Sequence, residues 1–306
     1  MSAKIKKVTT FGWENCYSIS EDQIEMIATA DIGPRIISFG PIGGKNFFKL
    51  FDQHLGKKNA EEWMIYGGHR LWSAPEDPVI SYIPDNSAVD VKIDQETGEV
   101  SFIRPPDESN LEKKITMRVA TKNQFVVFNE LTNKGRDPIT TASWGISSLA
   151  PGGVGFMPLN KIVTNEKRFQ ASASLNLWSY TDFNDPAYYW KQDWLEIDQT
   201  KCKSKQKIGL WNRVPWLAYR LEDLFLLIQV KEKQQDAAAY PDFGSNSELY
   251  FDKDMLELEF LSPWKTLNPG ESVSHTELWS LIKIEDGVDN DTAIKDFILP
   301  NLIELK

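Results

Sequence analysis

The chain has 306 residues, of which 41% are hydrophobic and 25% are charged. These proportions are ordinary for a soluble globular protein and exclude a disordered chain. The formal net charge of −10, from 34 basic and 44 acidic residues, disfavours nucleic acid as the main partner. No apolar run approaches the roughly 20 residues that a membrane-spanning helix needs, so we expect no membrane insertion.

The N-terminal residues and the cysteines predict a cytoplasmic protein. The segment from Met1 to Lys7 contains no apolar signal core, and Cys16 and Cys202 lie far apart without metal-ligand spacing. Reduced thiols in a reducing compartment are the simplest interpretation, and a single disulfide is the alternative.

Alternating patterns dominate the chain and predict β-hairpins. Apolar and polar residues alternate over residues 89–93 and again over 100–102, with a Gly-containing turn at 95–98. A second hairpin is predicted from residues 115–119 and 125–128, joined by a turn at 121–124. Near the end, strands at 255–261 and 273–284 are joined through Pro269 and Gly270, the residues that a type II turn favours.

Helical patterns are few. Asn290 or Asp291 can cap a short helix over residues 292–298, which Pro300 ends, and a helical turn is possible over residues 59–64. Many short strands separated by turns predict an all-β, mostly antiparallel sandwich or barrel. No repeat or linker divides the chain, so we expect a single domain over residues 1–306.

Residues 66–76 form the segment richest in candidate functional groups. Gly67 and Gly68 precede His69, which titrates near neutral pH, and Arg70, a permanent cation. Such a pair could hold a sugar and protonate its ring oxygen. The alternative is a glycine turn with a structural histidine.

Two carboxylates share one face of a predicted strand. In residues 256–260, Glu257 and Glu259 alternate with Leu256, Leu258 and Phe260. Like charges two residues apart raise each other's pKa, which would help one of them act as a base. A solvated outer face explains the pattern equally well.

Three further segments carry polar candidates. Arg35 lies in an apolar strand and needs an internal carboxylate or a ligand oxygen as its partner. The loop that begins at Tyr240 carries Asp242 and Glu248, which could line a cleft or cap turns. The lysine-rich run over residues 201–207 is interpreted as a solvated edge or loop.

Aromatic residues are unusually frequent. The chain contains 11 Trp, 9 Tyr and 16 Phe residues, together 12% of the sequence. Aromatic side chains fill β-sheet cores, and tryptophan in excess of core needs also suits pockets that stack on sugar rings. Composition does not decide between these two uses.

Several of these motifs, taken in order, resemble the galactose mutarotase-like superfamily, and most closely an uncharacterised branch of the DUF4380 type. The resemblance runs from about residue 24 to residue 282. Its segments are 31–39 (DIGPRIISF), 67–76 (GGHRLWSAPE), 131–133 (LTN) through 142–146 (ASWGI), 151–153 (PGG), 240–244 (YPDFG), 256–259 (LELE) and 267–271 (LNPGE).

This resemblance implies a β-supersandwich with a sugar cleft and an aldose 1-epimerase type of reaction. In such epimerases a glutamate removes the anomeric hydroxyl proton while a histidine protonates the ring oxygen. Glu259 or its neighbour Glu257 matches the family's glutamate. The stretch that carries the family's mid-chain histidine reaches Trp144 here, so His69 is the candidate acid.

The resemblance also implies where a sugar would bind. Substrate contacts are expected from Arg70, Arg35, Trp72, Trp144, Tyr240, Asp242 and Glu248. Proton transfer at an anomeric centre needs an acid and a base, so we expect neither a metal nor an organic cofactor.

Three hypotheses for function therefore stay open. The first is an aldose 1-epimerase-like isomerase acting on a small carbohydrate. The second is a non-catalytic carbohydrate-binding or sensing protein on the same fold. The third is a lyase or hydrolase acting on an acidic sugar. The identity of the sugar and the oligomeric state are open as well.

Overall fold

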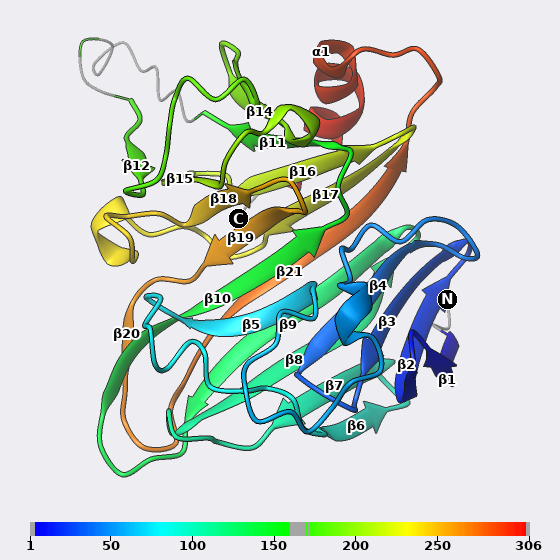
Figure 1. The fold of residues 1–306 in the computed structure, drawn as a ribbon, viewed down its shortest axis with the longest axis vertical. Helices are drawn as coiled ribbons and strands as arrows, with labels where there is room; N and C mark the ends of the chain where they lie inside the picture. The colour runs from blue at the N-terminus through cyan, green and yellow to red at the C-terminus, as the bar shows by residue number, and fades with distance from the viewer. Residues whose placement is uncertain (1–3, 160–168, 170–171, 304–306) are drawn as a thin grey trace.

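A computed structural model describes residues 4–159, 169 and 172–303 of the chain. Within these residues almost all regular structure is β-strand, arranged in two large sheets (Figure 1). Each strand pair of the two sheets is antiparallel, so the prediction of an all-β, mostly antiparallel fold is confirmed. No helix of the described residues is long and apolar enough to cross a membrane.

The first sheet contains eleven strands. Ten of them follow one another in space, and β20 (Lys265–Leu267) pairs with β10 beside this series. In spatial order they are β1 (Lys4–Thr10), β2 (Trp13–Glu21), β3 (Ile24–Thr29), β4 (Arg35–Pro41), β5 (Gly68–Ala74), β10 (Ile139–Leu149), β19 (Leu256–Leu261), β18 (Ser247–Phe251), β15 (Gln206–Leu210) and β12 (Leu175–Leu177).

The second sheet contains ten strands and packs against the first, with β10 against β9 and β21 and β5 against β8 and β9. In spatial order they are β13 (Tyr188–Trp190), β14 (Trp194–Asp198), β11 (Val154–Pro158), β16 (Trp216–Leu221), β17 (Leu224–Val230), β21 (Ser272–Lys283), β9 (Gln124–Asn133), β8 (Leu111–Thr121), β7 (Glu99–Arg104) and β6 (Asp90–Asp94).

The predicted turns are confirmed. Strands β6 and β7 form the first predicted hairpin, and β8 and β9 form the second. Before β21, Gly270 has a φ of +88° and the Glu271 N–H donates to the Asn268 carbonyl over 2.9 Å. Both features belong to a type II turn with glycine at its third position.

The helical predictions are confirmed only in part. The short helix α1 (Asn290–Ala293) continues through a π-helical turn, η4 (Ile294–Ile298), and a 3₁₀ turn, η5 (Leu299–Asn301). Its N-cap is Asp289, whose side chain accepts from the Thr292 N–H, so the predicted cap was one or two residues too late. Three further 3₁₀ turns are η1 (Asp52–His54), η2 (Gln199–Lys201) and η3 (Ala237–Ala239).

The helical turn predicted over residues 59–64 is wrong. This segment is an irregular loop, and Asn59 has a φ of +59°, which a right-handed helix excludes. The Asn59 N–H donates to the Asn86 carbonyl, and the Asn86 side chain donates to two carbonyls of the loop. These bonds satisfy backbone groups of the loop without a helix, and the last of them is to the residue before Trp63.

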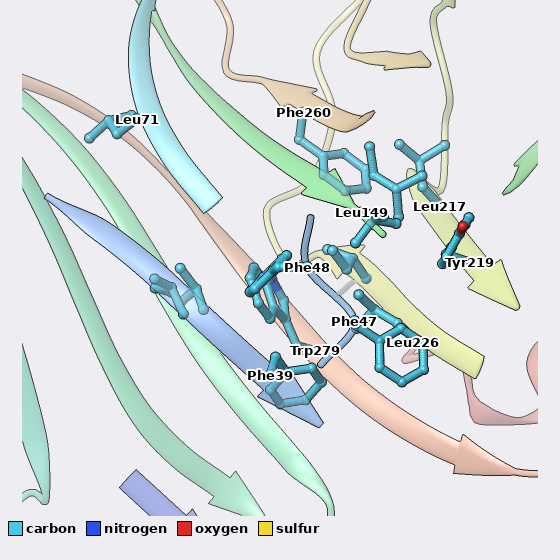
Figure 2. Close-up of a cluster of buried hydrophobic side chains, with 14 of the residues drawn as sticks. Phe39, Phe47, Phe48, Leu71, Leu149, Leu217, Tyr219, Leu226, Phe260 and Trp279 are labelled. Carbon is cyan, nitrogen blue, oxygen red and sulfur yellow. The ribbon is translucent and has the colours of Figure 1, made fainter. Parts of the chain in front are cut away.

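The hydrophobic core lies between the two sheets. Figure 2 shows Phe39 and Phe48 from the first-sheet side against Trp279 of β21, with ring centroids 5.5 and 5.6 Å apart. Leu149 of β10 and Leu226 of β17 belong to the same buried cluster. Burial of these side chains is the main favourable contribution to folding.

Candidate functional site

The central strands of the first sheet are buried on both faces. All residues of β5, β19 and β15 are buried, although only one face of each strand can contact the second sheet. Loops and side chains cover the other face and leave a cleft of about 370 Å³. The size is in the range of small-molecule sites, about 300–1,000 Å³.

Charged groups form the floor of this cleft. Arg70 comes from β5, Glu257 and Glu259 from β19, and Lys207 from β15. The strand register explains why they meet: Ile146 of β10 lies opposite Arg70 on one side and opposite Glu259 on the other. Residues on the same face of adjacent strands therefore bring both signs of charge together.

Glu257 is held by a cation and a hydroxyl. Its Oε1 lies 2.8 Å from Arg70 Nη1 and accepts from Ser148 Oγ, and Arg70 Nη1 also donates to Ser148 over 3.0 Å. Burial opposes ionisation of Glu257, but the Arg70 charge and these hydrogen bonds outweigh it, so its pKa lies below the usual glutamate value. Glu257 is therefore a poor proton acceptor at neutral pH.

Glu259 has a different environment. Its Oε2 accepts from Trp144 Nε1 and from Lys207 Nζ, both over 2.8 Å. Burial raises the pKa of this carboxyl above its usual value, because the opposing effect of the Lys207 ammonium is smaller and Glu257 adds like charge. Of the two cleft glutamates, Glu259 is the better candidate for a base.

Lys207 joins Glu259 to a third carboxylate. Its Nζ also lies 2.8 Å from Oε2 of Glu248, and it stands 4.6 Å from the Trp144 ring centroid and 4.7 Å from that of Trp178. Burial would lower the pKa of Lys207, but the two carboxylates raise it, so the ammonium stays charged. Burial raises the pKa of Glu248 well above its usual value despite Lys207.

Aromatic side chains stand on two sides of this floor. Trp63 and Tyr82, called here the β5 wall, lie with ring centroids 5.2 Å apart and also contact Trp72 of β5. Trp178 and Tyr180, called the β15 wall, lie above the lysines of the other side: the Tyr180 ring is 4.7 Å from Lys205 Nζ. Burial raises the pKa of Tyr82 and of Tyr180 to about 12, so both hydroxyls stay protonated.

His69 does not lie in the cleft, contrary to the expectation that it meets Glu259 there. It is 0% exposed and points from β5 toward the second sheet, because successive strand residues face opposite sides. Its Nδ1 lies 2.9 Å from Ser147 Oγ and its Nε2 lies 3.1 Å from Asn129 Oδ1. Burial lowers the pKa of His69, with Glu277 opposing the shift, so the neutral imidazole is favoured.

A buried polar cluster surrounds His69 between the sheets. His275 Nε2 lies 2.9 Å from Glu277 Oε1, and Asn129 links this pair to His69. Trp279 Nε1 donates to the other oxygen of Glu277 over 2.7 Å. A Cβ at Gly145 would lie 2.4 Å from Glu277 Oε1, so only glycine leaves room for the cluster against β10.

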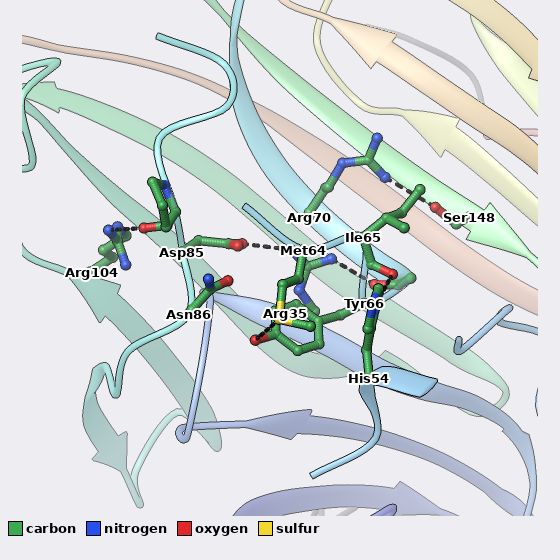
Figure 3. A network of polar contacts seen from close by, with 12 residues as sticks. Arg35, His54, Met64, Ile65, Tyr66, Arg70, Asp85, Asn86, Arg104 and Ser148 are labelled. Atoms are coloured by element: carbon green, nitrogen blue, oxygen red, sulfur yellow. Dashed lines mark hydrogen bonds and ion pairs between the residues drawn. The ribbon is translucent and has the colours of Figure 1, made fainter. Parts of the chain in front are cut away.

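Arg35 is also outside the cleft, contrary to expectation. Figure 3 shows Arg35 bonded to Asp85, while Arg70 reaches toward Ser148. Arg35 Nη2 lies 2.6 Å from Asp85 Oδ2, and Nη1 donates to the Gly67 carbonyl over 2.6 Å. Of the two partners that the sequence suggested, the structure supplies the internal carboxylate.

The remaining predicted contacts are divided. Trp72 and Trp144 line the cleft with Arg70, Glu257 and Glu259. Tyr240 lies outside the cleft: its hydroxyl donates to Gln234, and the residue lines a separate cavity.

Asp242 and Glu248 are not among the cleft-lining residues, although both lie near Lys207. Glu248 is fully buried, and it pairs with Glu259 across β18 and β19, so both side chains face the same side of the sheet. Burial raises the pKa of Asp242, and Lys207 opposes the shift.

Sequence reasoning missed several groups of the site. The lysine-rich run predicts a solvated position for Lys207, and the sequence pattern does not mark Trp63, Tyr82, Trp178 or Tyr180. One signal for Lys207 exists: it directly precedes residues 208–210 (Ile-Gly-Leu), which continue the same buried strand, β15. The four aromatic residues lie in loops, where no periodicity marks them.

The arrangement can bind a ring compound that has apolar C–H faces and hydroxyl groups at its edge. Aromatic surfaces contact C–H groups, while charged floor groups donate to and accept from hydroxyls. Glu259 can also accept a proton, because its carboxylate has a raised pKa inside the cleft.

Comparison with solved structures places this β-sandwich among galactose mutarotase-like folds. A galactose mutarotase-like protein from Lactobacillus casei has a TM-score of 0.56 at 10% identity, over 88% of this chain and 100% of that one. A galactose mutarotase related enzyme from Lactobacillus acidophilus has a TM-score of 0.53 at 10% identity, over 90% and 99%.

A third similar structure is a provisionally assigned aldose 1-epimerase from Escherichia coli K12, with a TM-score of 0.54 at 8% identity, over 88% of this chain and 99% of that one. No family model and no curated protein sequence matches the chain. At these identities the likeness establishes the fold alone.

Proposed function

We propose that this chain binds a carbohydrate in the cleft above β5, β10 and β19. The observation that carries the proposal is the combination of aromatic walls with a charged floor: Trp63 and Trp178 flank Arg70, Glu257 and Glu259. Sugars present apolar ring faces and hydroxyl edges, and this cleft offers complementary groups for both. The names of two similar structures, a galactose mutarotase-like protein and a galactose mutarotase related enzyme, are consistent with such a ligand.

Binding is tested by titration calorimetry with a panel of neutral sugars, amino sugars and uronic acids. We expect at least one class to bind, and the Trp144→Ala variant to weaken that binding by about tenfold, the size of a lost aromatic contact. Phe243→Ala is the matched control, because Phe243 is 97% exposed and does not line the cleft. Absence of binding across the whole panel would refute the proposal.

A second candidate function is aldose 1-epimerisation, favoured by the raised pKa of Glu259. Glu259 would take the proton of the anomeric hydroxyl. No histidine of the described residues lines the cleft, so the ring oxygen would receive its proton from another group. Tyr180 and the Lys207 ammonium are among the donors that line the cleft, and the raised pKa of each makes it a weak acid. This weakness is the reason why we rank binding above catalysis.

Polarimetry on freshly dissolved α-anomers separates the two candidates. If the protein is an epimerase, Glu259→Gln should slow anomer interconversion at least a hundredfold, the usual size of a general-base contribution. Glu99→Gln, at a half-buried glutamate of β7 outside the cleft, is the control for changes in buffering. Equal rates with and without protein, together with calorimetric binding, would leave binding as the function.

A further inference from the structure

The two aromatic walls stand over different strands of the sheet. Trp63 of the β5 wall lies 5.8 Å from Trp72, a residue of β5 itself. In the β15 wall, the Thr181 hydroxyl donates to the Lys207 carbonyl, which fixes the turn that carries Trp178 to β15. Both walls are thus anchored to rigid strands.

The strands that anchor the two walls are not neighbours in the sheet. Between β5 and β15 lie β10, β19 and β18. Neighbouring strands are about 4.8 Å apart, so β5 and β15 are separated by roughly 19 Å at the level of the backbone. The carboxylates of Glu257 and Glu259 come from β19, the middle strand of the five.

A series of rings connects the two walls. Trp72 contacts Trp144 with centroids 5.6 Å apart, and Lys207 stands between the rings of Trp144 and Trp178. A single pyranose ring, built from bonds of about 1.5 Å, is only about 3 Å across and covers a part of this series. A ligand that uses both walls must therefore contain more than one ring.

Unpaired donors at the β5 wall point to a ligand rather than to packing alone. Trp63 Nε1 and Arg70 Nε are buried, and neither has a hydrogen-bond partner in the part of the chain that the structure describes. A buried donor without an acceptor is costly, so such atoms call for an explanation. Oxygens of a bound sugar would supply acceptors at this wall. At the other wall, the exposed ammonium of Lys205 is a donor beside Tyr180.

We infer that the cleft accommodates a carbohydrate of at least two linked sugar rings, with one ring against the β5 wall and another against the β15 wall. This inference rests on the proposed function and narrows its substrate class to oligosaccharides or glycosides with a sugar-sized second group. The linked rings span β19, so the carboxylates of Glu257 and Glu259 face the region between them.

The test compares monosaccharides with their dimers by titration calorimetry. The probes are glucose, galactose, mannose and xylose, and the disaccharides maltose, cellobiose, lactose, mannobiose and xylobiose. We expect one disaccharide to bind at least tenfold more tightly than either of its component sugars. Trp63→Ala and Trp178→Ala should each weaken the binding of that disaccharide about threefold to tenfold, whereas a monosaccharide should respond to only one of them.

Matched controls keep this test decisive. Trp190→Ala removes a tryptophan that is 42% exposed on β13 of the second sheet, and it should leave every affinity unchanged. If an alanine variant loses its near-ultraviolet circular dichroism, the corresponding leucine variant replaces it, because leucine retains part of the volume.

Two outcomes would overturn the inference, and they differ from each other. In the first, a monosaccharide binds as tightly as its dimer, and one of the two wall variants changes the affinity for neither sugar. This result would refute the two-ring ligand and leave the proposed carbohydrate function intact. Failure of all these probes, and of the amino sugars and uronic acids of the earlier panel, to bind the wild-type protein would refute the proposed function itself, and the two-ring inference would fall with it.

Discussion

Glu257 and Glu259 lie two residues apart on β19 and line the same cleft, yet their pKa values move in opposite directions. Arg70 and Ser148 surround the acceptor oxygen of Glu257, whereas Glu259 shares the single charge of Lys207 with Glu248. The two carboxylates therefore have different tasks. Glu257 stays ionised as a partner of Arg70, and Glu259 can exchange a proton.

The opposite shifts predict two separate titrations in the cleft. Carbon-13 NMR of the glutamate side-chain carboxyls should give one midpoint below the ordinary glutamate pKa and one above it, with interaction between the sites. Glu257→Gln should remove the lower midpoint and Glu259→Gln the upper one. Two cleft carboxyls with the same midpoint would contradict the different environments described above.

Glu257→Gln should destabilise the protein by about 3–5 kcal/mol, because it leaves the buried Arg70 guanidinium without a counter-charge. Urea denaturation at pH 7 measures the free energy of unfolding. The control is Glu99→Gln, which removes a solvent-accessible ion pair with Arg118 and should cost less than about 1 kcal/mol. Equal losses in both variants would show that the Arg70 pair contributes no more than a surface pair.

The contribution of the Glu257–Arg70 pair to stability depends on pH in a defined way. The pKa of Glu257 is lowered by folding, so its contribution to stability is present above the unfolded glutamate pKa and is lost as the pH falls through the folded value. The free energy of unfolding should therefore decline more steeply on acidification in wild type than in Glu257→Gln. Parallel curves would exclude this linkage.

His69→Gln should affect stability and leave the cleft unchanged. Loss of buried hydrogen bonds to Ser147 and Asn129 should cost about 1–3 kcal/mol, while sugar affinity should change less than threefold. The pKa of His69 is lowered from the ordinary 6.5, so wild type should lose stability as the pH falls below that value, and the variant should lose less. Normal stability with abolished sugar binding or turnover would return His69 to the functional site.

Gly145→Ala should destabilise the protein by about 1–3 kcal/mol, because the added Cβ collides with the carboxylate of Glu277 and the ring of His275. Gly155→Ala is the comparison, since its nearest obstacle is the end of the flexible Leu256 side chain at 2.7 Å. Thermal unfolding followed by circular dichroism measures both variants. A larger loss at Gly155 than at Gly145 would argue against a tightly packed cluster between the sheets.

The sequence predicted the fold better than the site, and the reason is physical. Alternation of apolar and polar residues has a period of two, which revealed hairpins such as β8–β9 without further information. The same alternation decides which of two adjacent residues faces the cleft. It separates His69 from Arg70, so two neighbours in the sequence could not both lie at the site.

Burial was the quantity that the pattern could not supply. Glu257 and Glu259 alternate with leucines as residues of a solvated face do, yet they are only 6% and 1% exposed. Segments distant in the sequence cover them, among them the loop of Trp63 and the turn of Trp178. Such long-range cover leaves no local mark in the sequence.

The tryptophans of the cleft also make the protein its own optical reporter. Four of the eleven tryptophans, Trp63, Trp72, Trp144 and Trp178, line the cleft. Indole emission depends on the polarity and charge around the ring, and Lys207 lies within 5 Å of two of these rings, at 4.6 and 4.7 Å. A ligand that displaces water from this space should therefore change the intrinsic fluorescence, so that occupancy can be followed at low protein concentration without any label.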